Sequence, residues 1–269
     1  MPDQKELTKQ LSVLVVAFND TDKLKRCIDS ACKQLSHLDS WEIIIINNDK
    51  EIDINSLSLD FSKVNIIDHG KNVGFGRAIN MGAKKASGQT LLILNPDTEI
   101  LTDNIHNVLS EFSHEANLGI VGGGIIKQKG KKQEWSAGKE ASLYDLIRNN
   151  LGISRSKNIW NSKEKVSCDW VAGTTMFIRK DLFDELEGFD ENYFMYFEDM
   201  DLCHRARQKG KKVILFPDFK IFHSSGGSYT DKQLQKKHYY DSMEKFFKKN
   251  STKPAYWIIK ALRRTIIRK

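Results

Sequence analysis

Residues 72–82 read Asn-Val-Gly-Phe-Gly-Arg-Ala-Ile-Asn-Met-Gly, and residues 91–97 read Leu-Leu-Ile-Leu-Asn-Pro-Asp. These two stretches describe a glycine-broken turn, a short helix and an apolar strand that ends on a carboxylate. The turn allows the backbone to come close to a bound group, and Asp97 at the strand end can hold a divalent cation on a diphosphate. The sequence therefore predicts a pocket for a phosphorylated ligand.

Strand-like and helix-like segments alternate on both sides of this stretch. Apolar runs typical of buried parallel strands lie at 11–17, 41–46, 64–67 and 90–94, and helix-like segments lie at 21–33, 76–86 and 104–112. This order predicts an α/β fold with a mostly parallel sheet flanked by helices. Ligands of such sheets bind at the carboxyl ends of the strands. Five polar residues fall there: Asn19, Asn47, Asn48, Asp49 and Asp97.

The pattern weakens after Gly124, and residues 127–165 are predicted to form loops and short helices. Order returns with a strand at 175–179, a helix from near Asp199 to Lys209 and a strand at 213–216. No flexible linker separates the two halves. We therefore expect one domain over residues 1–229, with a nucleotide-binding part at about 11–125 and an acceptor and catalytic part at about 126–229.

Composition indicates a soluble globular protein. Of the 269 residues, 40% are hydrophobic and 29% are charged. The polar start lacks the apolar core of a signal peptide, and no run approaches the ~18 apolar residues that span a bilayer. The four cysteines show no metal-type spacing, which favours reduced, buried thiols in a cytoplasmic protein.

The positive charge is concentrated at the C-terminal end. Residues 231–269 carry twelve Lys or Arg and three Asp or Glu, a net charge of +9, so the preceding residues sum to −2 against a total of +7. A nearly neutral body is not typical of a nucleic-acid-binding protein, and we expect no nucleic-acid partner.

Residues 230–269 are predicted to form a basic tail of two helices. In the second helix an apolar stripe is flanked by Lys and Arg and accompanied by Tyr256 and Trp257, as in helices that lie in a membrane interface. The alternative is that the stripe packs against the domain. Its members are Ala255, Ile258, Ile259, Leu262 and Ile266.

Residues 197–202, Phe-Glu-Asp-Met-Asp-Leu, provide candidate acid–base chemistry. Asp199 is predicted to lie at a helix N-terminus, where exposed backbone N–H groups would keep its carboxylate ionised. A carboxylate of this kind can take a proton from an attacking hydroxyl. A plain helix-capping cluster needs only one acid, whereas this segment has three, Glu198, Asp199 and Asp201.

A dinucleotide-binding motif is the first alternative for the glycine turn. Gly74 and Gly76 match its first two glycines, but Ile79 occupies the position of the third, and no strand leads directly into the motif. A Rossmann dehydrogenase is therefore disfavoured.

The longer pattern resembles the family 2 glycosyltransferases. It comprises Asn-x-Gly-Phe-Gly-x-Ala-x-Asn-x-Gly from Asn72, Leu-Asn-Pro-Asp ending at Asp97, the acidic segment at 197–202 and His223, in order over residues 12–228. The resemblance implies a GT-A-type fold and an inverting transfer of a sugar. It also implies that Asp199 is the catalytic base, that Glu198 contacts the acceptor or the base, and that Asp201 is a supporting acid.

The same resemblance implies a donor site around the strand ends and the glycine turn. Two positions depart from the family pattern, because Asn47 and Asn95 stand where members usually carry Asp, and Asn-Pro-Asp resembles the variant of rhamnosyltransferase-like members. The implied donor-binding residues are Ala17, Asn19, Asn47, Asn48, Asp49, Asn72, Gly74, Arg77, Asn80, Asn95 and Asp97.

The resemblance further implies a cation and an acceptor pocket. Asp97 and His223 would hold Mg²⁺ or Mn²⁺ with diphosphate oxygens, and Trp170 and Gly173 would border the donor sugar and acceptor. Gly188-Phe189-Asp190 matches a segment that supports the catalytic loop.

Together these features predict transfer of a sugar from dTDP-rhamnose or a UDP-hexose to a lipid-linked oligosaccharide of a bacterial surface polysaccharide. The enzyme is expected at the inner face of the cell membrane. Two alternatives stay open: a sugar-nucleotide nucleotidyltransferase, although residues 17–22 lack the basic glycine-rich loop of those enzymes, and a degenerate carbohydrate-binding subunit, which the substitutions at Asn47 and Asn95 motivate.

Overall fold

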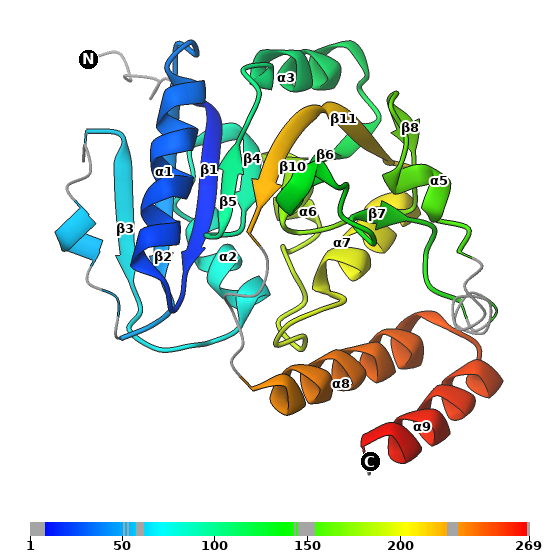
Figure 1. Cartoon of the computed structure of the whole chain (residues 1–269). Coiled ribbons are helices and arrows are strands. Elements are labelled where there is room, and N and C mark those ends of the chain that lie inside the picture. Colours follow the sequence, from blue (N-terminus) through cyan, green and yellow to red (C-terminus); the bar gives the residue numbers. More distant parts are fainter. Residues whose placement is uncertain are drawn as a thin grey trace, which may run out of the picture.

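A computed structural model of the chain describes residues 9–50, 52, 54–57, 62–142, 144, 154–224 and 231–267. Its described strands form one nine-stranded sheet and a small two-stranded sheet, with helices on both faces (Figure 1). The strands of the large sheet lie in the order β3-β2-β1-β4-β10-β6-β11-β5, and β8 pairs with β11.

The first half of the chain contains β1 (Lys9–Ala17), α1 (Thr21–Leu35), β2 (Trp41–Asn47), the 3-10 turn η1 (Ile54–Leu57), β3 (Val64–Asp68), α2 (Phe75–Ala83), β4 (Gly88–Leu94), β5 (Thr98–Ile100) and α3 (Ile105–His114).

The second half contains β6 (Leu118–Ile126), the 3-10 turn η2 (Gln128–Gly130), β7 (Ala137–Gly138), α5 (Lys157–Trp160), β8 (Val166–Ser167), β9 (Trp170–Val171), β10 (Thr175–Arg179), α6 (Lys180–Glu185), α7 (Glu198–Gln208), β11 (Lys212–His223), α8 (Lys232–Asn250) and α9 (Lys253–Ile267).

The parallel half of the sheet agrees with the prediction. β1 pairs in parallel with β2 and β4, and β3 extends β2 in the same sense. Every residue of β2 is buried, as expected for a strand covered on both faces. α1 and α2 lie on opposite faces of this half (Figure 1). Because β1 pairs in parallel with β2 and β4, the carboxyl ends of these three strands lie at one open edge of the sheet.

The other half of the sheet is mixed, with β6 and β11 in parallel and several antiparallel pairs beside them. β10 is antiparallel to both β4 and β6, and β5 is antiparallel to β11. β6 was not expected, because its run Gly122-Gly123-Gly124 disfavours a strand by propensity. Tertiary packing requires the glycines: a Cβ at Gly122 would lie 2.6 Å from the Val171 side chain.

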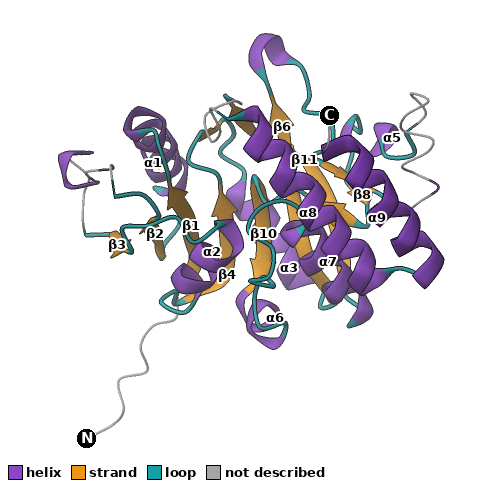
Figure 2. Cartoon of the chain, turned by 90° about the horizontal axis from the view of Figure 1, so that it is seen from below, coloured by secondary structure: helices purple, strands orange, loops and turns teal. Residues whose placement is uncertain are grey.

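The predicted C-terminal helices are present, and the first of them packs against the body. α8 lies across the edge of the sheet next to α7 (Figures 1 and 2), with Met243, Phe246 and Phe247 buried. In α9, Ile259 is fully buried, whereas Ile258 and Trp257 are exposed. The predicted stripe of α9 therefore divides between the protein and solvent; the side chains of Leu262 and Ile266 lie outside the described part.

Among the described residues, no helix combines the length and the apolar character needed to cross a membrane.

Candidate active site

Antiparallel pairing of β5 with β11 brings Asp97 and His223 together. Thr98 lies opposite His223 in this ladder, and the Nε2 atom of His223 is 3.2 Å from Oδ1 of Asp97. The other ring nitrogen, Nδ1, lies 2.6 Å from Oε1 of Gln133. Both side chains are largely buried. Two residues that are more than a hundred positions apart thus form one polar pair.

The chemistry of this pair fits a divalent cation. With Nδ1–H donated to Gln133, the lone pair of Nε2 faces Asp97, whose Oδ1 is buried without a hydrogen-bond partner. Neutral imidazole and carboxylate are suitable ligands for Mn²⁺ or Mg²⁺. The described residues contain no cluster of three or more metal-binding side chains.

Asp199 and Glu198 begin α7 on the same edge. The carboxylate of Asp199 accepts hydrogen bonds from the backbone N–H of Gly173 at 3.0 Å and of Met200 at 2.8 Å. Glu198 is 5% exposed, and its Oε2 has no hydrogen-bond partner. The two residues before α7, Tyr196 and Phe197, are both left-handed, with φ of 69° and 66°. Backbone strain of this kind gathers at functional sites.

A short chain of hydrogen bonds connects Asp199 to the strand end that carries Asp97. Gly173 N–H donates to Asp199, and the carbonyl of the next residue, Thr174, accepts from Asn95 N–H at 3.1 Å. Ser224 N–H, next to His223, donates to the Asp97 carbonyl at 3.0 Å. The segments that carry Asp97, His223 and Asp199 therefore meet at one edge of the sheet.

Burial changes the electrostatics expected for the two acids. It raises the pKa of the Asp199 carboxyl above its usual value, although the N–H groups of Gly173 and Met200 act in the opposite direction. Burial therefore opposes the effect that the sequence predicts for the backbone N–H groups at Asp199. Burial, and then the charge of Asp199, raises the pKa of Glu198 well above its usual value. Of the two acids, Glu198 is the better holder of a proton.

Asp201 belongs to a buried ion-pair network. It is fully buried, with its carboxylate 2.7 Å from Nε of Arg205 and 2.8 Å from Nζ of Lys249. Arg205 also donates to the carbonyls of Leu186 and Gly188. Asp201 thus fixes α7 to the segment before the catalytic loop, which is consistent with a supporting role.

The glycine turn serves close packing as well as turn geometry. Gly74 has φ of +89°, and a Cβ there would lie 2.5 Å from the Phe194 carbonyl oxygen; a Cβ at Gly76 would lie 2.9 Å from Cβ of Phe189. Phe75 N–H donates to the Phe194 carbonyl at 3.1 Å. The sequence predicts that these glycines let the backbone come close to a bound group. In the structure, the segment that comes close to them is the protein's own loop at 189–198.

Asn48 and Asn72 hold the glycine turn from the other side. Nδ2 of Asn48 donates to Oδ1 of Asn72 at 3.1 Å, and these two amide oxygens accept from Val73 N–H and Gly74 N–H, both at 3.0 Å. Asn48 N–H in turn donates to the Ala17 carbonyl at 3.0 Å. The turn is therefore fixed to the ends of β1 and β2.

The end of β2 is occupied by internal hydrogen bonds. Asn47 is 6% exposed, and its amide donates to Asp68 at 3.1 Å while its oxygen accepts from Asp49 N–H at 3.2 Å. Asp49 accepts from the N–H of Asn19, an exposed residue with φ of 66°. Asp49 is therefore nearer the open edge than Asn47.

Asn80 and Arg77 differ in what they can still bind. The amide of Asn80 exchanges hydrogen bonds with the Phe189 backbone, both at 2.9 Å, so it fixes α2 to the Gly188-Phe189-Asp190 turn. Arg77 is more than half exposed, and its Nε is 2.8 Å from Glu191. Of these two predicted donor residues, Arg77 is the one with an accessible charge.

The remaining predicted residues line the edge through their backbones. The Asn95 carbonyl accepts from the Thr98 hydroxyl at 2.7 Å. Trp170 is 8% exposed, with its indole N–H donated to the Lys139 carbonyl at 3.0 Å. Gly173 lies between Phe75 and Asp199, since a Cβ there would be 3.2 Å from the Phe75 ring.

Sequence reasoning missed the contribution of α8 to this site. Side chains of α8 contact the loop that leads into α7 at several points. His238 stacks on Phe194 with ring centroids 4.7 Å apart, Tyr239 and Phe246 pack on Phe197, and Gln235 donates to the Tyr196 hydroxyl. Three further side chains bond to loop oxygens. These three are Ser242 to the Met195 carbonyl, Lys245 to the Asn192 carbonyl and Lys249 to Asp190. Nothing in the local sequence indicates these contacts, because they join segments about 50 positions apart.

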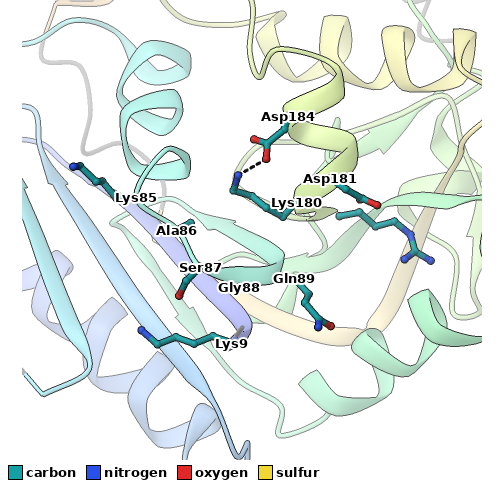
Figure 3. A pocket seen from close by; sticks show the side chains of 10 residues that line it. Lys9, Lys85, Ala86, Ser87, Gly88, Gln89, Lys180, Asp181 and Asp184 are labelled. Atoms are coloured by element: carbon teal, nitrogen blue, oxygen red, sulfur yellow. Dashed lines mark hydrogen bonds and ion pairs between the residues drawn. The ribbon is translucent and has the colours of Figure 1, made fainter. Parts of the chain in front are cut away.

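A separate hollow of about 910 Å³ lies at the opposite, amino end of β4 (Figure 3). Two of its lysines form ion pairs: Lys180 with Asp184, and Lys9 with the buried Glu42. Arg179 donates to the carbonyls of Phe112, Leu118 and Glu115. None of the predicted site residues lines this hollow.

Comparison with known proteins identifies the family. Residues 12–186 match the family described as Glycosyl transferase family 2. The chain belongs to this family. The match covers more than half of the chain and includes the glycine turn, Asp97 and Gly173, whereas α7, His223 and α8 lie beyond it.

Three relatives of this family 2 glycosyltransferase are similar over most of its domain. It is 25% identical to the low-salt glycan biosynthesis hexosyltransferase Agl10 of Haloferax volcanii, over 83% of this chain and 80% of the relative. It is 25% identical to the rhamnosyltransferase WbbL of Escherichia coli K12, over 78% and 82%. It is 23% identical to the N-acetylglucosaminyl-diphospho-decaprenol L-rhamnosyltransferase of Mycobacterium tuberculosis, over 62% and 61%.

A solved structure supports the GT-A-type fold. That of GalNAc-T7 with UDP, GalNAc and Mn²⁺ superimposes with a TM-score of 0.64 at 17% identity, over 91% of this chain. The glycosyltransferase spans 48% of that longer protein. At this identity the likeness concerns the fold alone.

Replacing Glu198 by Gln should stabilise the glycosyltransferase at neutral pH. An acid whose pKa is raised by folding favours the folded state at low pH, and this advantage is lost as pH rises from the unfolded pKa to the folded one. Gln removes that loss, so the variant should be more stable than the unmodified protein at pH 7. Urea unfolding measures the gain, which should shrink toward the ordinary pKa of Glu. A constant difference at every pH would contradict the assignment.

Replacing Lys249 by Met should reduce turnover more than donor affinity. The change removes two ion pairs from the catalytic loop and leaves Asp201 with Arg205 alone. Lys249 is 40% exposed but Asp201 is fully buried and keeps only Arg205, so the stability loss should be roughly 1 to 3 kcal/mol. We expect kcat to fall roughly tenfold, as for a misplaced catalytic group, with KM for the donor nearly unchanged. Steady-state kinetics should show rescue by Lys249→Arg and no effect of Lys248→Met, the exposed neighbour; equal effects at both positions would exclude a positioning role.

Proposed function

We propose that this glycosyltransferase transfers a sugar, with inversion, from a nucleoside-diphosphate donor to a hydroxyl group of a lipid-linked glycan in bacterial surface polysaccharide synthesis. The observation that carries the proposal is the meeting of three groups at one sheet edge: the Asp97–His223 pair, suited to a cation, and the buried carboxylate of Asp199. Family membership sets the reaction class, and these residues supply its chemistry.

Asp199 acts as the general base. Its two oxygens are oriented by Gly173 N–H and Met200 N–H, which hold the carboxylate in place as the acceptor hydroxyl approaches. The acceptor oxygen attacks the anomeric carbon and its proton passes to Asp199. The bond from the anomeric carbon to the diphosphate oxygen breaks, and its electron pair leaves with the diphosphate. One displacement inverts the anomeric centre.

Burial of Asp199 suits it to this role. A raised pKa makes the carboxylate a stronger base than an exposed Asp, and proton transfer is most efficient when the pKa of the base is closer to the working pH. Glu198, protonated next to it, would donate a hydrogen bond to an acceptor or donor oxygen. A neutral Glu198 also spares Asp199 a neighbouring negative charge.

Asp97 and His223 would hold Mg²⁺ or Mn²⁺ on the donor. When bound, the cation neutralises charge on the departing diphosphate. Gln133 orients the imidazole by accepting its Nδ1–H, which is how partners of metal-binding histidines commonly act.

The donor would lie along the ends of β1, β2 and β4. Asp49 and Asn19 are the accessible groups for the nucleoside, and Arg77 for the diphosphate. Asn47, Asn48, Asn72, Gly74 and Asn80 would act by holding the turn. The rhamnosyltransferase names of two relatives and the Asn-Pro-Asp sequence favour dTDP-rhamnose, with a UDP-hexose second.

The acceptor is proposed from chemistry at the C-terminal end and from one relative. The relative from Mycobacterium tuberculosis is named for N-acetylglucosaminyl-diphospho-decaprenol, a lipid-linked sugar. In α9, Trp257 is 60% exposed next to Ile258 at 45%, and Lys260 lies over the Trp257 ring at 4.8 Å. An exposed aromatic residue with a neighbouring cation suits a membrane interface, where a lipid-linked acceptor would be reached.

Asp199→Asn should abolish transfer while sparing donor binding. Loss of the base should reduce kcat by roughly 10² to 10⁴, and the isosteric amide keeps the shape of the pocket. Transfer from labelled dTDP-rhamnose or UDP-hexose to a lipid-linked acceptor measures turnover, and calorimetry measures donor binding. Asp22→Asn, an exposed change on α1, is the control. Turnover retained in Asp199→Asn would refute the base assignment.

His223→Ala should weaken donor binding only when Mn²⁺ or Mg²⁺ is present. The imidazole is proposed as a ligand, so its loss should raise the donor Kd with metal roughly 10- to 100-fold and leave the Kd in chelator unchanged. His106→Ala, an exposed change on α3, should behave as the unmodified protein. Equal donor affinity of His223→Ala and the unmodified protein in metal would remove the cation role.

A further inference from the structure

The chain leaves β6 in an ordered hairpin that the proposed reaction does not use. This segment, residues 126–135, is called the lysine hairpin below. Lys127 N–H donates to the Lys131 carbonyl at 2.7 Å, Gln133 N–H donates to the Ile125 carbonyl at 2.8 Å, and Ile126 forms a bridge with Lys132. Its tip is a tight left-handed turn, with φ of 61° at Lys129 and 71° at Gly130.

The lysine hairpin projects into open space. A Cβ at Gly130 would meet no atom within 4 Å, and Lys127, Lys129 and Lys131 are exposed. In Figure 2 the chain beyond β6 stands out from the body of the molecule. A protruding surface does not enclose a small ligand, which binds in concave sites. Its shape fits a broad, flat partner.

The lysine hairpin carries four lysines and one acid, Glu134, and so an excess of positive charge. Within the part of the chain that the structure describes, Lys127, Lys129 and Lys131 form no ion pair. At its base, burial and the like charges of Lys163 and Lys220 lower the pKa of Lys132. Binding of an anionic partner would lower the electrostatic repulsion among these lysines.

Trp135 adds an aromatic ring to the same surface. It is 44% exposed and has φ of 59°, a left-handed conformation that is unfavourable for a bulky residue. Its ring packs on the buried Trp160, with centroids 4.9 Å apart. The fold therefore holds a strained backbone in place while leaving this ring open to solvent, and an indole beside lysines is typical of membrane-interface anchors.

We propose that the lysine hairpin docks on an anionic lipid bilayer, with its lysines at the headgroups and Trp135 in the interface. This surface is distinct from α9. Docking would bring the active-site edge to the lipid, because Gln133 of the hairpin bonds to His223 at 2.6 Å and Ser136 accepts from Ala172 N–H, next to Gly173, at 2.8 Å. The inference rests on the proposed function only for its purpose, access to a lipid-linked acceptor.

The test is sedimentation of the full chain with vesicles of phosphatidylcholine alone or with added phosphatidylglycerol. The unmodified protein should bind only the anionic vesicles. K127Q/K129Q/K131Q should bind them roughly 100-fold more weakly, since each surface lysine contributes about fivefold. The control, K33Q/K84Q/K85Q, removes the same charge from exposed lysines away from the hairpin and should bind far better than the hairpin variant.

Tryptophan fluorescence separates the hairpin from α9. With bromine-labelled acyl chains in the anionic vesicles, Trp257→Phe should retain quenching, and adding Trp135→Phe should remove most of it. Quenching that does not depend on Trp135, or equal weakening of binding by both triple variants, would overturn the proposal. Release by inorganic pyrophosphate but not by chloride of equal ionic strength would overturn it in favour of a diphosphate site.

The slow hydrolysis of the donor needs no membrane. Measuring it therefore separates a failure of the proposed sugar transfer from a failure of the proposed membrane docking. Hydrolysis should be equal in the unmodified protein and K127Q/K129Q/K131Q. Loss of hydrolysis in the hairpin variant would show a disturbed active site and overturn the docking role. If the unmodified protein transfers and hydrolyses no tested donor, the proposed function fails while vesicle binding still decides the inference.

Discussion

The buried carboxylate of Asp201 is the interaction on which the catalytic edge depends. A fully buried anion is stable only when it is paired, and Asp201 is paired with Arg205 of its own helix and Lys249 of α8. Arg205 continues to the carbonyls before the loop, and Lys249 to Asp190. The loop that presents Glu198 and Asp199 is therefore held at both of its ends.

This support allows the loop to keep an unfavourable backbone. Tyr196 and Phe197 are consecutive left-handed residues, a conformation that costs about 1 to 3 kcal/mol for each. Aromatic contacts with α8 and the packing of Gly74 and Gly76 against the loop oppose that strain. The glycine turn and the loop that carries the acids thus depend on each other. A larger side chain at Gly74 or Gly76 would collide with that loop.

The two halves of the site differ in their electrostatics. On one side Asp97 and His223 lie 3.2 Å apart in a geometry that suits a cation; on the other, burial raises the pKa values of Glu198 and Asp199 above their usual values. The proposed transfer with inversion would use both conditions, a cation for the departing diphosphate and a strengthened base for the incoming hydroxyl. The lysine hairpin extends the same edge toward a proposed lipid surface.

Local periodicity and short motifs such as residues 72–82 report local structure. They were therefore enough to predict the parallel half of the sheet, the two C-terminal helices and the family. The glycine-rich strand β6, the meeting of Asp97 with His223 and the contact of α8 with the loop were decided only by the tertiary structure. Pairing between distant strands places these groups, and burial sets the ionisation of Asp199; neither is encoded in any single segment.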